Sequence, residues 1–150
     1  MRKAIICDID QCLLDSTIPI MMKETAKSTL SEEEAWDLFY NNLHLCKKNE
    51  WCYTLLEQMT LNTDIKVIFI TGREERARKH TKAFLKFNHS IDWDLYMRPT
   101  GCLDEDAKVK RDIMNTIKDD YDWLFALDDR ESNCSVFNDY GITTLKVTSL

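Results

Sequence analysis

Glycine, proline and long apolar runs are scarce in this chain of 150 residues, which has three glycines and two prolines. No run approaches the roughly 20 apolar residues that a membrane-spanning helix requires. The first residues, Met1-Arg2-Lys3, are basic, but Asp8 and Asp10 interrupt the following apolar run too early for a signal peptide. We therefore expect a cytoplasmic protein.

Paired cysteines and an excess of positive charge are also absent. The six cysteines include no Cys-x-x-Cys pair, which in a chain without export signals predicts reduced thiols. His44, Cys46 and Cys52 make an incomplete zinc ligand set and are expected to be packing residues. The net charge of −6 argues against bulk electrostatic binding of nucleic acid, although it leaves room for a small basic patch.

What the chain does contain is five short apolar runs separated by stretches of helical periodicity. Strands that alternate with helices predict crossover connections and a parallel sheet covered on both faces. We therefore expect residues 1–150 to form one doubly wound, Rossmann-like α/β domain with a mostly parallel five-stranded sheet. The expected strands are residues 3–7, 65–70, 93–97, 123–127 and 142–147, and helical stripes cover residues 51–59, 77–87 and 109–117.

One segment, about residues 16–50, interrupts the alternation of strands and helices. Ser31 and Glu34 form a capping-box pattern that predicts the start of a helix, with Ala35 and Phe39 on its apolar side. Because the segment follows the first strand, two placements are open. It forms either a small helical cap over the strand ends or a helix packed on the flank of the sheet.

Polar residues follow the predicted strands at the points where those strands end. In a parallel doubly wound sheet these ends meet along one edge, where ligands bind. We therefore expect the polar residues to share one pocket. The set comprises Asp8, Asp10, Thr71, Arg73, Arg98, Asp106, Lys110, Asp128 and Asp129.

So many neighbouring carboxylates raise one another's pKa unless a cation neutralises them. Oxygen ligands without histidine favour a hard ion such as Mg²⁺. A carboxylate beside this ion can attack a phosphoryl group, and a second one two residues on can protonate the leaving oxygen and then activate water. Each motif alone also fits a turn, a helix cap or a solvated side chain, but their order after successive strands favours the chemistry.

In this order the motifs resemble those of the haloacid dehalogenase superfamily of phosphatases, over residues 5–147. The resemblance implies that Asp8 is the nucleophile and that Asp10 is the general acid and base. It further implies that Thr71 and Lys110 hold the phosphate. The implied Mg²⁺ site comprises the carboxylates of Asp8 and Asp128, the backbone carbonyl of Asp10, and Asp129 in support.

A narrower resemblance rests on "FITGRE", "MRPTG" with "DAKVKRDI", and "ALDDR" with "VFNDYGI". These stretches are similar to the 3′-phosphatase domain of bacteriophage polynucleotide kinase/phosphatase. That similarity implies a 3′-phosphorylated end of DNA or RNA as substrate, with contacts from Arg73, Arg98 and Asp106. The chain has no G-x-x-x-x-G-K-[ST] loop, so a free-standing phosphatase without a kinase half is expected.

The chain departs from the family pattern in three places. Gln11-Cys12 replaces the usual Gly-Thr or Gly-Val after the first motif, which predicts a rearranged or strained loop. Cys102 and Asp104 replace an aspartate and an arginine, which changes the expected substrate contacts. The cap-like segment around residues 30–46 also looks larger than in the phage domain.

Three functions are open on the sequence alone. A phosphatase of polynucleotide 3′-ends is favoured by Arg73, Arg98, Asp106 and Lys110. A phosphatase of a small phosphomonoester, such as a nucleotide or sugar phosphate, is favoured by the larger cap, because a lid excludes long polymers. A non-catalytic binding domain would be favoured by loss of a motif aspartate, and both aspartates are present.

Two further features bear on nucleic-acid binding. The helix expected after Thr71 places Lys79, Lys82 and Lys86 on one face, which is either a solvated surface or a groove that follows a strand. Aromatic residues offer either stacking platforms for bases or ordinary core packing. These residues are Trp36, Tyr40 and Tyr96.

Overall fold

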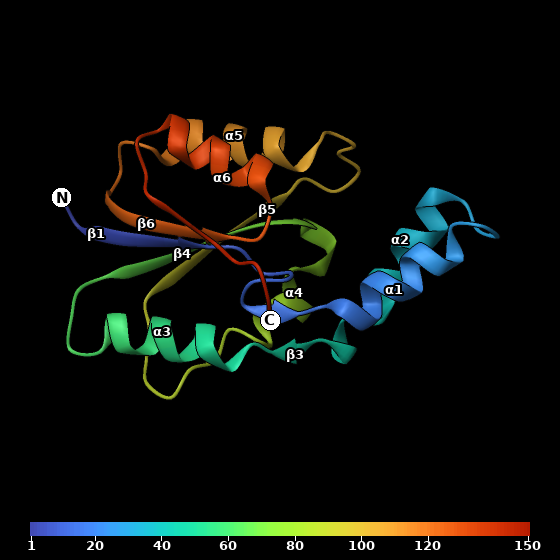
Figure 1. Cartoon of the computed structure of the whole chain (residues 1–150), viewed down its shortest axis with the longest axis horizontal. Helices are drawn as coiled ribbons and strands as arrows, with labels where there is room; N and C mark the ends of the chain where they lie inside the picture. The colour runs from blue at the N-terminus through green and yellow to red at the C-terminus, as the bar shows by residue number, and fades with distance from the viewer.

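The computed structural model describes every residue from 1 to 150. Its central sheet has five strands in the order β5-β4-β1-β6-β7, all paired in parallel (Figure 1). The strands are β1 (Lys3–Cys7), β4 (Lys66–Glu74), β5 (Trp93–Arg98), β6 (Asp122–Asp128) and β7 (Thr144–Lys146). The predicted doubly wound α/β fold is confirmed.

Helices cover both faces of the sheet (Figure 1). Along β1, Ile5 and Cys7 enter one core, whereas Ala4 and Ile6 enter the other. This alternation explains the unbroken apolar run, because a strand buried on both faces has no solvent side. None of the helices has the length and apolar character needed to cross a membrane. α3 (Glu50–Thr60) and α4 (Arg78–Lys82) lie on one face, and α5 (Asp106–Ile117) and α6 (Glu131–Asp139) on the other.

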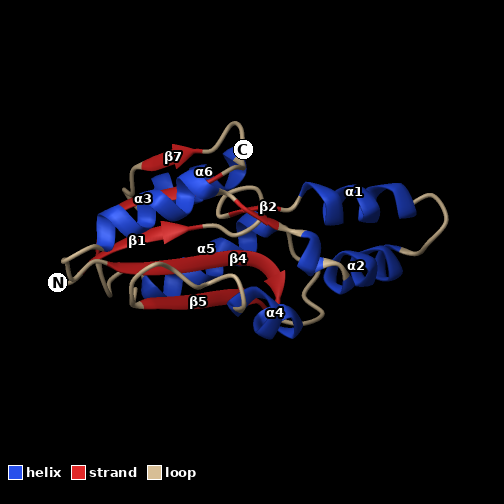
Figure 2. Ribbon diagram, turned by 90° about the horizontal axis from the view of Figure 1, so that it is seen from below, coloured by secondary structure: helices blue, strands red, loops and turns tan.

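An insertion after β1 projects beyond the carboxyl ends of the strands (Figures 1 and 2). Its base is a two-stranded antiparallel pair, β2 (Leu14–Asp15) with β3 (Lys47–Lys48). Between them, α1 (Thr17–Ala26) and α2 (Glu32–Asn41) form a helical hairpin, followed by the short 3₁₀ helix η1 (Leu43–Leu45). The insertion therefore takes the cap-like placement and does not pack on the flank of the sheet.

The capping box predicted at the start of α2 is present. The Ser31 hydroxyl accepts a hydrogen bond from the Glu34 backbone N–H at 3.1 Å, and the Glu34 carboxylate accepts one from the Ser31 backbone N–H at 3.3 Å. The two bonds satisfy backbone donors that the first turn of a helix leaves unpaired.

The prediction of a helix over residues 77–87 is mostly wrong. β4 runs through Thr71 to Glu74, a 3₁₀ turn η2 (Glu75–Ala77) follows, and α4 ends at Lys82. The chain leaves the helix because Phe87 packs on Phe69 and on Tyr53 in the α3-side core. Lys86 therefore lies outside α4, and the predicted shared face of three lysines does not exist.

Candidate active site

A cavity of about 390 Å³ opens at the carboxyl edge of the sheet, under the insertion. Six of the predicted site residues line it directly. Three others, Thr71, Lys110 and Asp128, are completely or almost completely buried beside it. The structure therefore gathers the predicted set at one place. The six lining residues are Asp8, Asp10, Arg73, Arg98, Asp106 and Asp129.

Lys110 joins the first and last acidic motifs beneath the floor of this cavity. Its Nζ atom lies 2.9 Å from Asp8 Oδ1 and 2.6 Å from Asp128 Oδ2, and the lysine has no exposed surface. Burial alone lowers a lysine pKa, but the charges of Asp8, Asp128 and Asp106 outweigh burial and raise the pKa of Lys110. The ammonium group therefore stays charged and fixes both carboxylates.

Asp8 is nevertheless held in an unfavourable environment for its own charge. Burial and the neighbouring Asp128 raise the pKa of Asp8 well above its usual range, in spite of Lys110. Burial and Asp128 likewise raise the pKa of the half-buried Asp129. One lysine does not neutralise three close carboxylates, and a divalent cation would lower these pKa values.

The donor set fits Mg²⁺. Asp8, Asp128 and Asp129 each offer a carboxylate oxygen, and these oxygens lie within 4.8 Å of one another. Ligands on opposite sides of octahedral Mg²⁺ are about 4.2 Å apart, given Mg–O bonds of about 2.1 Å. The three oxygens thus lie close to the spacing of one coordination shell, and no nitrogen or sulfur donor belongs to the group.

Asp10 faces the insertion and has a different partner. Arg73 binds its carboxylate with two hydrogen bonds, Nε to Oδ2 at 2.9 Å and Nη2 to Oδ1 at 2.6 Å. The Ser16 hydroxyl donates a further bond of 2.5 Å to Oδ1. Burial by itself would raise the pKa of Asp10, but the Arg73 charge outweighs burial and lowers this pKa. Asp10 is therefore ionised in the substrate-free protein.

Arg73 is itself locked in place. Its side chain is almost fully buried, and Nη1 donates to the Thr81 hydroxyl at 3.0 Å while Nη2 contacts Cys46 Sγ at 3.6 Å. The sequence predicts a helix after Thr71, whereas Arg73 lies in the last part of β4. Its guanidinium positions Asp10, and its predicted contact with substrate stays a prediction.

The segment Thr71-Gly72-Arg73 forms an irregularity in β4, where the register against β5 shifts between Thr71 and Glu74. A side chain at Gly72 would place its Cβ 2.1 Å from Asp106 Oδ1 and would force the Asp106 carboxylate to move. The Thr71 hydroxyl accepts a bond of 3.1 Å from the Arg73 backbone N–H. The alternative in which Thr71 only caps a helix is wrong, because the strand continues through it.

Arg98 and Asn133 order the wall next to Asp106. Arg98 donates to the backbone carbonyls of Gly72, at 2.9 Å, and of Cys102, at 3.2 Å, and also to that of Asp104. Asn133 donates to Asp106 Oδ2 at 2.8 Å and to Asp128 Oδ1 at 3.1 Å. Asn133 was not among the predicted site residues. Its one indication in the sequence is its place in the first turn of α6, the helix that follows the acidic pair.

The loop after Asp10 is strained, as the replacement of glycine by Gln11 predicts. Gln11 has φ of +59°, in the left-handed region. Its side chain offsets part of this cost, because Oε1 accepts a bond from the Ser16 backbone N–H at 2.9 Å and Nε2 donates to Thr17 Oγ1 at 3.3 Å. Gln11 therefore holds Ser16 next to Asp10. Ser16, like Asn133, was missed from the sequence.

A parallel sheet that carries a DxD pair after β1, an acidic pair after β6 and a buried lysine between them defines a class. The chain is a phosphatase of the haloacid dehalogenase superfamily. Two solved structures share this fold at 16% identity. A predicted phosphatase from Clostridium acetobutylicum gives a TM-score of 0.69 over 99% of this chain and 85% of its own. A haloacid dehalogenase-like hydrolase from Streptococcus pneumoniae gives 0.67 over 95% and 83%.

Within this class the chain belongs to the family of the polynucleotide kinase PNKP phosphatase domain, whose model matches residues 2–149. A chain of the Pnkp1/Rnl/Hen1 complex is 26% identical, with a TM-score of 0.71 over 98% of this chain. A second structure of that complex, described as an RNA repair complex, gives 25% and 0.72. Our chain spans less than half of those chains, 46% and 42%. Curated protein sequences contain no match.

Proposed function

We propose that this protein is a Mg²⁺-dependent polynucleotide 3′-phosphatase that acts through an aspartyl-phosphate on Asp8. The observation that carries the proposal is the division of the DxD pair. Lys110 holds Asp8 on the sheet side, and Arg73 holds Asp10 on the insertion side. Two carboxylates with separated environments suit a nucleophile and a proton-transfer group.

In the first step, an Asp8 oxygen attacks phosphorus and the bond from phosphorus to the 3′-oxygen breaks. The leaving oxygen takes a proton from Asp10, which yields a free 3′-hydroxyl and an aspartyl-phosphate. Because Arg73 keeps Asp10 ionised before substrate binds, the substrate phosphate, whose second pKa is about 6, binds as the monoanion and first gives this proton to Asp10.

In the second step, Asp10 accepts a proton from water, and the water oxygen attacks phosphorus. The bond from phosphorus to Asp8 breaks, which releases phosphate and restores the carboxylate. The first step leaves Asp10 ionised again, which is the form that accepts this proton. Ser16 and Arg73 orient the carboxylate, so that it serves both steps without moving.

Asp8, Asp128, Asp129 and the Asp10 carbonyl would hold Mg²⁺, which would neutralise the phosphoryl oxygens during transfer. Lys110 orients Asp8 and adds a second positive charge beneath the phosphate. Thr71, buried at the end of the regular part of β4, is proposed to contact the phosphate as in the family motif.

Nucleic-acid ends are the proposed substrates because the chains it resembles belong to an RNA repair complex. Arg98 and Asp106 line the same cavity and are proposed to contact the end of the nucleic-acid strand.

We also propose one domain over residues 1–150, with residues 16–50 as its cap, and a cytoplasmic location.

A small phosphomonoester is the second candidate. The insertion contributes Ile20, Lys23 and Trp36 to the cavity wall, and a lid of this kind limits access for long polymers. Trp36 is not a free stacking platform for a base, since Lys23 Nζ lies 3.8 Å from its ring centroid and Tyr40 stacks 5.9 Å away.

Phosphate release separates the two candidates. The substrates are a 3′-phosphorylated oligonucleotide and the mononucleotide 3′- and 5′-phosphates, each with and without Mg²⁺, with Asp8→Asn as the blank. A preference for the oligonucleotide supports the proposal. Turnover of mononucleotides alone overturns the polynucleotide assignment and keeps the chemistry. No turnover of any substrate favours a binding domain.

A further inference from the structure

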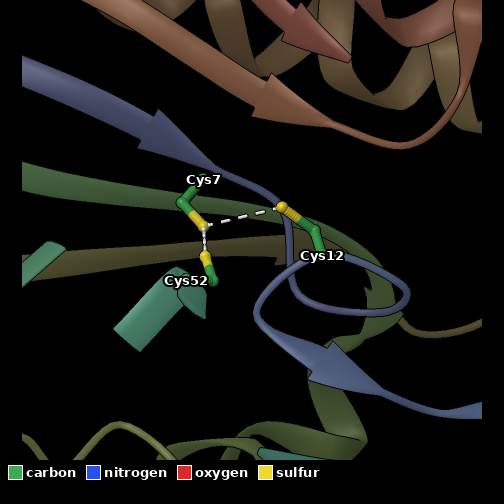
Figure 3. A group of neighbouring side chains, drawn as sticks. All are labelled: Cys7, Cys12 and Cys52. Carbon is green, nitrogen blue, oxygen red and sulfur yellow. Dashed lines mark hydrogen bonds between the residues drawn. The ribbon is translucent and has the colours of Figure 1, made fainter. Parts of the chain in front are cut away.

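Three cysteine thiols meet on the α3 side of β1 (Figure 3). Cys7 Sγ lies 3.9 Å from Cys12 Sγ and 3.8 Å from Cys52 Sγ, and all three sulfurs lie within 4.8 Å of one another. The three residues have no exposed surface. Cys7 ends β1, Cys12 lies in the loop after it, and Cys52 lies in the first turn of α3.

The backbone holds these thiols together independently of any contact between them. Asn49, the residue before α3, is buried, and its Nδ2 donates to the Cys12 carbonyl at 2.8 Å. The Asn49 backbone N–H donates to the Leu13 carbonyl at 3.0 Å. These two bonds tie the start of α3 to the loop, so Cys52 and Cys12 approach Cys7 with little freedom to separate.

We propose that Cys7, Cys12 and Cys52 form a binding site for one soft monovalent cation, Cu(I). Thiolate ligands select soft ions. With metal–sulfur bonds of about 2.3 Å, the sulfurs of one coordination shell lie about 3.8 Å apart in tetrahedral and about 4.0 Å apart in trigonal geometry. Two of the three sulfur–sulfur distances in the cluster already have these values, so the thiols move little when the ion binds.

The number of ligands and the charge favour Cu(I) over zinc. Structural zinc is almost always four-coordinate, and the group contains three donors. A monovalent ion also carries a smaller desolvation penalty into an apolar core than a divalent one. Each thiol that binds the ion does so as a thiolate and releases its proton to solvent, and the first thiolate balances the single positive charge.

The site joins three elements, the end of β1, the loop that carries Gln11, and the start of α3. Because two of the three sulfur separations already match a coordination shell, the bound ion braces this loop with little displacement of Asp8 or Asp10. We expect occupancy to raise the thermal midpoint of unfolding, since an ion that binds only the folded chain stabilises it. This expectation does not depend on the proposed phosphatase reaction.

The test uses the purified full chain under anaerobic, reducing conditions without Mg²⁺. Competition with the chromophoric Cu(I) chelator bicinchoninate measures affinity, and native mass spectrometry measures stoichiometry. We expect one Cu(I) per chain, a higher midpoint of unfolding by circular dichroism, and much weaker retention of Zn²⁺. No Cu(I) on the folded chain, or no change of the midpoint when it is bound, overturns the proposal.

Variants assign the ligands. Cys52→Ser and Cys12→Ser are expected to lose tight Cu(I) binding. Cys134→Ser is the matched control. Cys134 is also buried, but its sulfur contacts the Asp128 backbone carbonyl at 3.8 Å and does not belong to the thiol cluster. Retention of binding by the first two variants overturns the assignment. Should either variant fail to fold, Cys52→Ala replaces it, and the stoichiometry of the wild-type chain still decides whether the site exists.

Discussion

Asp8 and Asp10 are two residues apart, yet they lie in opposite electrostatic surroundings. Asp8 belongs to the sheet side, where it shares Lys110 with Asp128 and where burial raises its pKa. Asp10 belongs to the insertion side, where the charge of Arg73 outweighs burial and lowers its pKa. One short motif therefore carries one carboxylate that shares its cation with Asp128 and one that has an arginine as its own partner.

The difference shows how a fold divides one motif into two roles. The Asp8 side is left with negative charge that a divalent cation can neutralise, whereas the Asp10 side is complete without one. Groups with separated pKa values are the usual basis of nucleophile and acid–base assignments. Substitutions, acid titration and removal of Mg²⁺ each test whether this division is real.

Replacing either aspartate should abolish most of the turnover, and more so at Asp8. Asp8→Asn removes the proposed nucleophile and should lower the rate by about 10⁴-fold or more, whereas Asp10→Asn removes proton transfer and should cost about 10²–10⁴-fold. Single-turnover phosphate release with Mg²⁺ measures both. Asp15→Asn, in β2, is the control with a near-normal rate. An Asp8→Asn variant within tenfold of wild type contradicts the assignment.

Lys110→Met should destabilise the sheet side by about 3–5 kcal/mol, because Asp8 and Asp128 then lose their buried counter-charge. Urea denaturation without Mg²⁺ gives the free energy of unfolding. The matched control is Lys108→Met on the same helix, whose exposed pairs with Asp104 and Asp112 are worth at most about 1 kcal/mol. Equal losses in the two variants would show that Lys110 is not a structural ion pair.

Acid titration should separate the two aspartates by sign. The lowered pKa of Asp10 stabilises the fold above the unfolded value of about 3.9, and this stability is lost as pH falls through the folded pKa. Asp10→Asn should therefore cost about 2–3 kcal/mol at pH 7 and progressively less in acid.

The raised pKa of Asp8 has the opposite consequence. The contribution of Asp8 to the free energy of unfolding is fully present below the unfolded pKa and is lost as pH rises through the folded pKa. Without divalent cations, Asp8→Asn should gain stability relative to wild type between pH 4 and 7, and added Mg²⁺ should reverse the gain. Unfolding free energies measured across this range check both signs, and parallel curves for the two variants contradict the division.

Substitution of Gln11 should have the smallest effect on the free energy of unfolding. Gln11→Gly relieves a positive φ worth about 1–2 kcal/mol but loses two side-chain hydrogen bonds of about 1 kcal/mol each, so stability should change by at most about 1 kcal/mol. Gln11→Ala keeps the strain and loses the same bonds. It should therefore be about 1 kcal/mol less stable than the glycine variant in thermal unfolding. Equal stabilities would mean that the backbone is not strained.

Much of the fold was predictable because strands buried on both faces leave unbroken apolar runs, and because the polar residues follow those runs. The expected strands all appear, with shifted ends, and the capping box of Ser31 begins α2. The helix over residues 77–87 failed since its apolar spacing reflects Phe87 packing on Phe69, a contact between distant residues. Trp51, the first residue of the apolar stripe predicted over residues 51–59, is 40% exposed.

Local patterns of apolar and polar residues encode the parallel α/β fold, the strand-end motifs and the family resemblance. Three other features appear only in the folded chain: Arg73 pairs with Asp10, Asn133 bridges Asp106 and Asp128, and Cys52 meets Cys7. Those partners are between 5 and 63 residues apart along the chain. Such pairings arise from the packing of whole elements, which local periodicity does not record.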